Sequence, residues 1–308
     1  MLDGDEIAAL LTPLLPAHAL KHFHATGIAD ASLRLTSVGR FRVNVHHERG
    51  RAAAAIRVLP TRVPTVTELN LPPEIEQLSK LTRGLVLIGG ATGSGKTTTL
   101  AALDAINRRD PKHIITVEDP IEYEHAHLAG LVEQVEVGVD APDFPTALRA
   151  AVRQAPDILV IGEMRDPESM RIALSAAETG HLVLSSLHTT DVTATIGRIA
   201  DSFPDERQNT IRQELSLALS AIVTQWLVPK SGGGRVPAAE VLRVSYGARQ
   251  HIRKNALQHL HQEITITRKQ GSITLEESLA RLVKSGAISR TDAMERAGHQ
   301  DELDALLG

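Results

Sequence analysis

Short apolar runs alternate with stretches of helical periodicity through the middle of the chain. The apolar runs lie at Leu85–Ile88, Ile114–Val117, Ile158–Ile161 and Leu182–Ser186. Apolar residues at helical spacing lie between them, at Thr97–Asn107, Thr146–Gln154 and Met170–Thr179. Runs of four or five apolar residues are typical of strands buried on both faces. The alternation therefore predicts an α/β domain with a parallel sheet covered by helices on both sides.

A smaller unit precedes this domain. Helical spacing at Ile7–Phe23, interrupted by Pro13 and Pro16, is followed by three predicted strands, at Ala31–Leu35, Phe41–Val45 and Ala52–Leu59. Prolines 60, 64, 72 and 73 then indicate a linker with little regular structure. We therefore divide the chain into a small α+β domain, residues 1–63, and a larger domain, residues 64–308. The part from about residue 205 to 308 is predicted to be mostly helical, with a flexible loop at Ser231–Gly234.

Composition excludes several classes of protein. The 308 residues carry a net charge of -4, which is a poor match for a protein whose main partner is nucleic acid, so we expect no direct nucleic-acid binding. There is no cysteine, which excludes disulfides and thiolate zinc sites. No signal peptide and no apolar run of about 20 residues is visible. We expect a cytoplasmic protein that is not inserted in a membrane and reaches one only through partners.

A phosphate-binding loop follows the strand that ends at Ile88. The pattern runs from Gly90 to Thr97 and leads into a predicted helix. The residues expected to bind nucleotide are Gly90, Ala91, Thr92, Gly93, Ser94, Gly95, Lys96, Thr97 and Thr98. The glycines let backbone N–H groups face a phosphate, Lys96 reaches the β- and γ-phosphates, and the Thr97 hydroxyl holds Mg²⁺. The alternative, a chance glycine-rich turn, is disfavoured by the strand before the loop and the helix after it.

Acidic residues follow the next two strands. Glu118 ends one strand, where a carboxylate can meet Mg²⁺ or its bound waters. Glu163 follows another, where an ATPase needs a general base for the attacking water. His188 follows the strand at 182–186, at a position that can sense the γ-phosphate. Taken singly, each could be an ordinary residue at a strand end; their order after the loop favours catalysis.

Four motifs in this order resemble those of secretion-type ATPases. They are GATGSGKT (90–97), ITVEDPIEY (115–123), ILVIGEMRD (158–166) and GHLVLSSLHTT (180–190), which are similar to the Walker A, Asp, Walker B and His boxes. Within that superfamily the chain most resembles the type IV pilus retraction (twitching motility) ATPases, over nearly its whole length. The resemblance implies a RecA-like ATPase domain preceded by a PAS-like domain. It also implies a hexameric ring that uses ATP and Mg²⁺ to retract pili.

The resemblance also assigns roles to residues. Glu163 is implied as the catalytic glutamate, Glu118 as part of the Asp box and His188 as the His-box histidine. Thr97, Glu118 and Glu163 would hold Mg²⁺, partly through water. Arg42 and Arg57 match the arginine fingers of the family, which would spread the charge of the γ-phosphate; a solvated strand arginine is the alternative reading. The implied partners are other copies of the chain, an inner-membrane platform protein and the pilus machinery, at the inner face of the cytoplasmic membrane.

Departures from the family pattern in the first domain and in one later motif affect the interpretation. By length, the first domain should lack roughly the first quarter to third of its counterpart, so the sequence begins late, has been trimmed, or belongs to a paralogue with a reduced domain. The motif that the family ties to retraction reads GARQHIRK at 247–254, with His251 and Lys254 in place of Leu and Glu. An assembly, type II secretion or DNA-uptake ATPase, and a nucleotide-binding regulatory paralogue, therefore remain alternatives. A small-molecule P-loop kinase is a weaker alternative.

The histidine pairs 125/127 and 259/261 are interpreted as exposed or capping residues rather than metal ligands.

Overall fold

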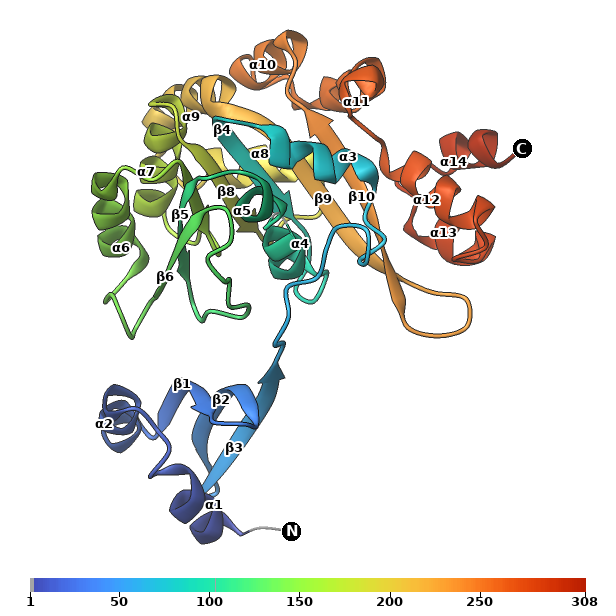
Figure 1. The fold of residues 1–308 in the computed structure, drawn as a ribbon. Helices are drawn as coiled ribbons and strands as arrows, with labels where there is room; N and C mark the ends of the chain where they lie inside the picture. Colours follow the sequence, from blue (N-terminus) through green and yellow to red (C-terminus); the bar gives the residue numbers. More distant parts are fainter. Residues whose placement is uncertain (1–2, 103) are drawn as a thin grey trace.

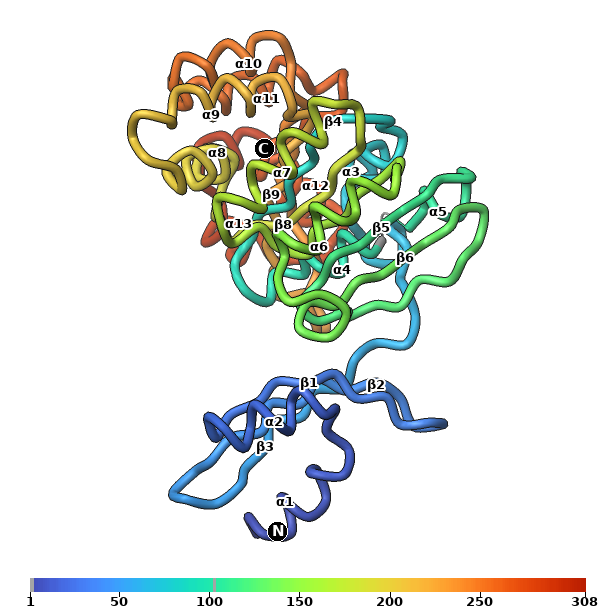
Figure 2. The backbone as a smooth tube through the Cα atoms, turned by 90° about the vertical axis from the view of Figure 1, so that its left-hand side faces the viewer, coloured from blue at the N-terminus to red at the C-terminus, as the bar shows by residue number. Residues whose placement is uncertain are grey.

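The computed structural model describes residues 3–102 and 104–308. Two units are joined by a single linker, with the smaller N-terminal unit below the larger one in Figure 1. Residues 60–72 carry no helix or strand in this structure, which confirms the linker predicted from the prolines. The side view in Figure 2 shows the same separation of the two units.

The N-terminal unit is a three-stranded antiparallel sheet with two helices on one face. Its elements are α1 (Gly4–Leu11), α2 (Ala17–Thr26), β1 (Ile28–Leu35), β2 (Gly39–Glu48) and β3 (Arg51–Leu59), with β2 in the centre. The predicted break in the first helix is confirmed, because Pro13 and Pro16 lie in the turn between α1 and α2. Val43 and Val45 of β2 point to the helices and are buried there. By the two-residue period of a strand, Arg42 and Asn44 point to the opposite face.

The larger unit is an α/β domain. Its strands are β4 (Gly84–Gly89), β5 (His113–Glu118), β6 (Leu131–Glu136), β7 (Ile158–Ile161), β8 (Leu182–Leu187), β9 (Leu219–Pro229) and β10 (Arg235–Arg243). Its helices are α3 (Pro73–Glu76), α4 (Lys96–Ala102), α5 (Ala105–Arg109), α6 (Phe144–Ala151), α7 (Pro167–Glu178), α8 (Val192–Ala200), α9 (Asp205–Ala218), α10 (Tyr246–Arg253), α11 (Leu260–Ile266), α12 (Leu275–Lys284), α13 (Arg290–Arg296) and α14 (Gln300–Leu307).

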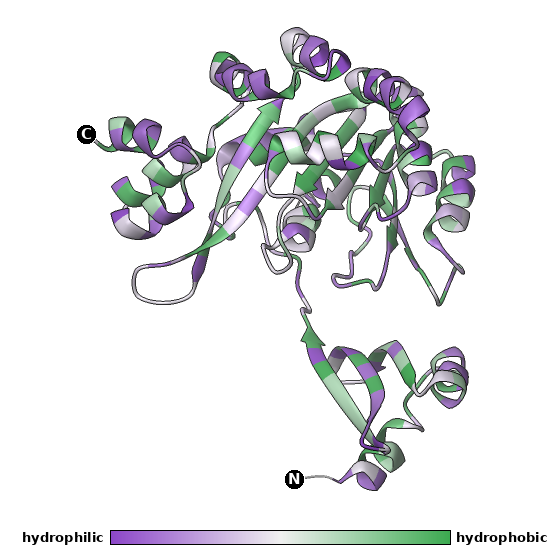
Figure 3. Ribbon diagram, turned by 180° about the vertical axis from the view of Figure 1, so that it is seen from behind, coloured by the Kyte–Doolittle hydropathy of each residue, from purple (hydrophilic) through white to green (hydrophobic). Residues whose placement is uncertain are grey.

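The described strands of this unit form one sheet in the order β10-β9-β4-β8-β7-β5-β6. All neighbours are parallel except β10, which runs antiparallel to β9. The phosphate-loop strand β4 is therefore central, and every residue of β4 and β8 is buried. In Figure 3 the strands of this sheet are coloured largely as apolar residues, whereas the helices around them carry many polar residues. The predicted parallel sheet covered on both faces is confirmed.

Three helices of this unit begin at an aspartate that caps them. The side chains of Asp143, Asp166 and Asp191 accept hydrogen bonds from backbone N–H groups in the first turns of α6, α7 and α8. Asp166 closes the Walker B motif and Asp191 follows the His box. The caps at Asp166 and Asp191 therefore start α7 and α8 shortly after β7 and β8, the strands that Glu163 and His188 follow.

Three predictions of secondary structure need correction. The region from residue 205 is not helical throughout: after α9, strands β9 and β10 form a hairpin whose turn contains Ser231–Gly234. No glycine or proline separates α9 from β9, so the apolar residues of both merge into one pattern that resembles a helix. Strand β6 was missed because its outer-edge residues are partly exposed. The helix predicted at 97–107 is divided into α4 and α5, and residue 103 within it lies outside the described residues.

Among the described residues, no helix is long and apolar enough to cross a bilayer.

Candidate active site

The phosphate-binding loop lies between β4 and α4, as predicted. Gly93 and Gly95 have φ angles of 78° and 91°, which only glycine adopts readily. The Lys96 side chain folds over the loop and donates hydrogen bonds from Nζ to the carbonyls of Gly90 and Ala91, at 2.8 and 3.1 Å. Burial lowers the pKa of Lys96, while Glu163 acts in the opposite direction. An ammonium held here without a full counter-charge suits an anionic ligand.

The Ser94 hydroxyl is a second feature of the loop that fits a phosphate-binding site. The Ser94 Oγ atom is buried and has no hydrogen-bond partner among the described residues. Buried hydroxyls are normally paired, so this hydroxyl is available to a group that enters the loop. Ser94 was predicted as a nucleotide-binding residue, and its position supports that prediction.

Glu163 and His188 lie side by side, although they follow different strands. His188 Nε2 lies 3.2 Å from Oε1 of Glu163, and His188 Nδ1 lies 3.3 Å from Nζ of Lys96. Adjacent parallel strands β7 and β8 end at the same edge of the sheet, which brings these side chains to the phosphate loop. Arg165 holds the other carboxylate oxygen, donating from Nε to Oε2 of Glu163 at 2.9 Å. The sequence did not single out Arg165, although it stands in the same motif.

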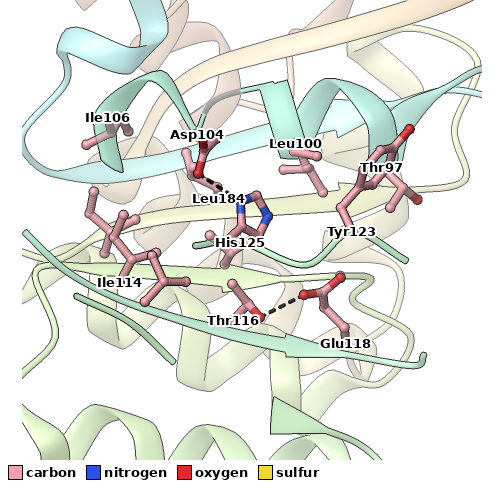
Figure 4. Close-up of a pocket in the computed structure, with 15 residues that line it drawn as sticks. Thr97, Leu100, Asp104, Ile106, Ile114, Thr116, Glu118, Tyr123, His125 and Leu184 are labelled. Atoms are coloured by element: carbon pink, nitrogen blue, oxygen red, sulfur yellow. Dashed lines mark hydrogen bonds and ion pairs between the residues drawn. The ribbon is translucent and has the colours of Figure 1, made fainter. Parts of the chain in front are cut away.

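Glu118 lies deeper than Glu163, at the end of β5. Its Oε1 accepts hydrogen bonds from the Thr116 hydroxyl at 2.7 Å and from Gln134 Nε2 at 3.1 Å. Burial raises the pKa of Glu118, and these two donors only partly offset that effect. Figure 4 shows Glu118 at one end of a small cavity beneath α4, with Thr97 nearby and the Asp104–His125 pair toward the other end. Thr97, Glu118 and Glu163 all line one cleft, so the predicted Mg²⁺ residues are brought together.

That cleft lies between the two units and has a volume of about 590 Å³, within the usual range of about 300–1,000 Å³ for small-molecule sites. Its walls include Lys96, Glu118 and Glu163 from the larger unit and Arg42 and Arg57 from the N-terminal sheet. The two predicted arginine fingers therefore lie on the same cleft as the phosphate loop of their own chain. Lining residues that the sequence analysis did not assign to the site are Asp119, Pro120, Glu122, Phe144, Gly162, Arg165, Ser186, Leu227 and Arg235.

Direct contacts hold the N-terminal sheet against the loop that follows β5, residues 119–124, which we call the Asp-box loop. Arg40 donates from its guanidinium to the Ile121 carbonyl at 2.8 Å, and its Nε lies 3.1 Å from Oε1 of Glu124. Arg34 also pairs with Glu124. Arg34 of β1 lies opposite Arg40 of β2, so Arg34, Arg40 and Arg42 share one face of the sheet. This polar face contacts the loop and lines the cleft.

The histidine pair 125/127 and Arg249 could suggest other functional sites, but their side chains bond to neighbouring groups of the protein. His125 pairs with Asp104 at 2.8 Å, and His127 Nδ1 accepts the Val132 N–H at 3.1 Å. Arg249, from the altered retraction motif, donates to the Leu217 carbonyl at 2.8 Å and to the Ser216 carbonyl. Arg249 thus satisfies carbonyls at the C-terminal end of α9, where a cation is favoured.

A phosphate loop on the central strand, with a glutamate and a histidine from neighbouring strands turned toward it, defines this chain as a P-loop ATPase of the α/β class. The chain belongs to the family described as "Type II/IV secretion system protein", which matches residues 32–300.

Comparison with individual proteins places the chain near pilus ATPases. It is 42% identical to the "Type IV pilus retractation ATPase PilT" of Pseudomonas aeruginosa, over 96% of this chain and 86% of that protein. It is 37% identical to a "Twitching motility protein" of Neisseria gonorrhoeae, over 98% of this chain and 81% of that protein. The solved structure titled "Crystal Structure of the Pilus Retraction Motor PilT and Bound ADP" matches with a TM-score of 0.89 at 42% identity, covering 98% and 86% of the two chains. These findings confirm the resemblance inferred from the four motifs.

Proposed function

We propose that this chain is a motor subunit that hydrolyses ATP to power the retraction of type IV pili. Its similarity to a retraction ATPase and a twitching motility protein over nearly the whole chain supports this function. The observation that carries the proposal is the cleft between the two units, which gathers the phosphate loop, Glu163 and two arginines. A site divided between two units suits a motor, because a change in the bound phosphates alters contacts on both sides.

The chemistry follows from the positions of the side chains. Lys96 and the backbone N–H groups of the loop bind the β- and γ-phosphates. Glu163 accepts a proton from the water whose oxygen attacks the γ-phosphorus, while the bond to the bridging oxygen of ADP breaks. The His188 ring lies 3.2 Å from Oε1 of Glu163 and 3.3 Å from Nζ of Lys96, and is placed to sense the γ-phosphate. Arg42 and Arg57 lie on the cleft wall that faces the loop, where a guanidinium can spread the developing charge.

Mg²⁺ fits the acidic side of the same cleft. Oxygen ligands are what this ion prefers, and Thr97, Glu118 and Glu163 present a hydroxyl and two carboxylates to the cleft. When bound, Mg²⁺ would neutralise charge on the β- and γ-phosphates. The raised pKa of Glu118 fits such a role, since a buried carboxylate with little counter-charge gains most from a nearby cation.

The family resemblance supports the assembly and location that we propose. The working form is a hexameric ring in the cytoplasm, at the inner face of the cytoplasmic membrane. The ring acts on an inner-membrane platform protein and through it on the pilus machinery. Nucleic acid is not a proposed partner, given the net charge of -4.

A second function, a different pilus ATPase role, has one observation in its favour. The chain is also 40% identical to the "Type IV pilus ATPase PilU" of Pseudomonas aeruginosa, over 88% of its length. His251 and Lys254 also alter the motif that the family ties to retraction. Assembly, secretion and DNA-uptake roles, or regulation of another motor with little turnover, are the alternatives for the test below.

The test is the ATPase rate as a function of protein concentration, with the mass determined in the same samples with and without ATP and Mg²⁺. A rate that rises cooperatively as a species of about six subunits forms supports the ring motor. A monomer that binds ATP without turnover points to the regulatory alternative. In a host whose own retraction ATPase has been deleted, expression of this chain should reduce the number of surface pili if it retracts them. An increase instead would indicate assembly.

A further inference from the structure

The inner side of the phosphate-binding loop contacts one buried side chain from a distant strand. A loop whose N–H groups face a phosphate turns carbonyl groups away from it, and these need partners inside the protein. The Ser94 carbonyl finds its partner in Gln225 of β9, whose Nε2 donates to it at 2.5 Å. Gln225 is 1% exposed, so this contact is shielded from water.

The other end of the same side chain contacts helix α4. Gln225 Oε1 accepts a hydrogen bond from the Thr99 hydroxyl at 2.7 Å. One amide therefore joins the loop, at Ser94, to the first turn of the helix, at Thr99. Both hydrogen-bonding ends of Gln225 are used, and both contacts lie in the strand–loop–helix unit that binds the phosphates.

Two loop glycines are packed against the same residue. A Cβ at Gly95 would lie 3.1 Å from Nε2 of Gln225, and one at Gly90 would lie 2.9 Å from its backbone carbonyl oxygen. Glycine at these positions thus leaves space for β9, in addition to allowing backbone angles that other residues rarely adopt. The loop cannot shift toward β9 without meeting Gln225.

Strand β9 also carries the C-terminal helices. Trp226 and Val228 point to the face opposite Gln225 and pack with Leu279, Ile288 and other apolar residues of the region from α12 to α14. The hairpin turn that follows is held there too, since Ser231 N–H donates to the Ala287 carbonyl at 2.8 Å. A displacement of the C-terminal helices would therefore pull on the strand that supports the loop.

We propose that Gln225 is a positioning residue for nucleotide binding: its amide holds the phosphate-binding loop in place and connects it, through β9, to the C-terminal helices. The inference rests on the proposed function only in that the loop must bind ATP. Gln225 is not among the described residues that line the cleft. Its effect passes through the position of the Ser94 and Gly95 backbone.

The test compares ADP affinity, by calorimetry, and steady-state kinetics for variants of the full chain. Gln225→Leu keeps the bulk of the side chain but leaves the Ser94 carbonyl unpaired. Gln225→Glu keeps the acceptor for Thr99 but loses the donor. We expect Gln225→Leu to weaken ADP binding about tenfold or more, with KM for ATP rising by a similar factor and kcat changing less. Gln225→Glu and Thr99→Val should have smaller effects of the same kind.

The control is Thr224→Val, the neighbouring buried residue on the other face of β9. It should leave ADP affinity unchanged even if it lowers the melting temperature. In a double-mutant cycle, Thr99→Val should add little to Gln225→Leu, because the two remove one shared contact.

The outcomes separate the two proposals. If the wild-type chain binds no ADP, the proposed function fails. If it binds ADP and both Gln225→Leu and Thr99→Val bind equally well, Gln225 has no positioning role. Should Gln225→Leu fail to fold, Gln225→Glu and Thr99→Val decide the question by the same comparison. Loss of thermal stability without any loss of affinity in those variants also overturns the proposal.

Discussion

Arg42 and Arg57 are directly opposite one another on strands β2 and β3, and both line the cleft that holds the phosphate-binding loop. Cross-strand partners share one face of a sheet. Two like charges placed together in this way gain from an anion between or beside them, so their pairing favours a phosphate in the cleft.

We expect Arg42→Ala and Arg57→Ala each to lower kcat for ATP by about 10³-fold or more, the range measured when an arginine finger is lost. ADP affinity should change only a few-fold, because the β-phosphate is bound by the loop. Arg49→Ala is the control, since Arg49 lies in the exposed turn between β2 and β3. Unchanged kcat in both variants would show that neither arginine reaches the γ-phosphate.

Glu163→Gln should bind ATP with near wild-type affinity and hydrolyse it at least about 100-fold more slowly. The amide preserves the shape of the side chain but cannot accept the proton of the attacking water. Glu168→Gln, an exposed change on α7, serves as the matched control. A single-turnover assay with radiolabelled ATP measures the chemical step directly. Turnover at the wild-type rate would contradict the role of Glu163 as the base.

Arg40→Ala should lower the free energy of unfolding by about 2 kcal/mol, because it removes a buried guanidinium that contacts one backbone carbonyl and one carboxylate. It should also expose the 60–72 linker to proteases, since these contacts hold the N-terminal sheet on the Asp-box loop. Urea denaturation and limited proteolysis measure the two effects.

Arg34→Ala is the matched control for Arg40. The Arg34 side chain is 63% exposed although it pairs with the same Glu124. An exposed pair contributes about 0–1 kcal/mol, so this variant should remain close to wild type. If the two variants behaved alike, the docking of the two units would not depend on Arg40.

Glu240→Gln should stabilise the chain above neutral pH. Glu240 is buried on β10, and burial raises its pKa to about 7, while the Thr224 hydroxyl, donating at 3.1 Å, acts in the opposite direction. A carboxyl whose pKa is higher in the folded state contributes stability below its unfolded pKa and loses it as the pH rises through the folded value. The wild-type chain should therefore lose stability between about pH 4.5 and pH 7, on the order of 3 kcal/mol.

The measurement for Glu240 is the difference in unfolding free energy between Glu240→Gln and wild type across pH 4.5 to 9. The difference should grow up to about pH 7 and then level off. His261 and Glu276 are the charged neighbours that also act on Glu240, so their titration belongs in the fit. For Glu295→Gln, at an exposed position, the difference in unfolding free energy from wild type should not change with pH. A flat difference for Glu240→Gln would mean that its carboxyl is not destabilised by burial.

The sequence by itself determined the α/β class, the linker and the phosphate loop, and it predicted that Glu163 and His188 lie beside that loop. These are local properties: a buried strand, a glycine loop and a capped helix are each encoded within about a dozen residues. Because all parallel strands of one sheet present their carboxyl ends at one edge, the side chains that follow β4, β7 and β8 could be expected to meet there.

Only the tertiary structure decided the contacts between distant segments. The strand period places Arg40 and Arg42 on one face, but docking of the N-terminal sheet on the Asp-box loop determines that this face lines the cleft. Likewise, the 219–243 segment carries a helix-like apolar pattern, and pairing of β9 with β4 makes it a strand. That pairing brings Gln225 under the loop, 131 residues from Ser94. Hydrogen bonds across such separations depend on packing and leave no periodic signal in the sequence.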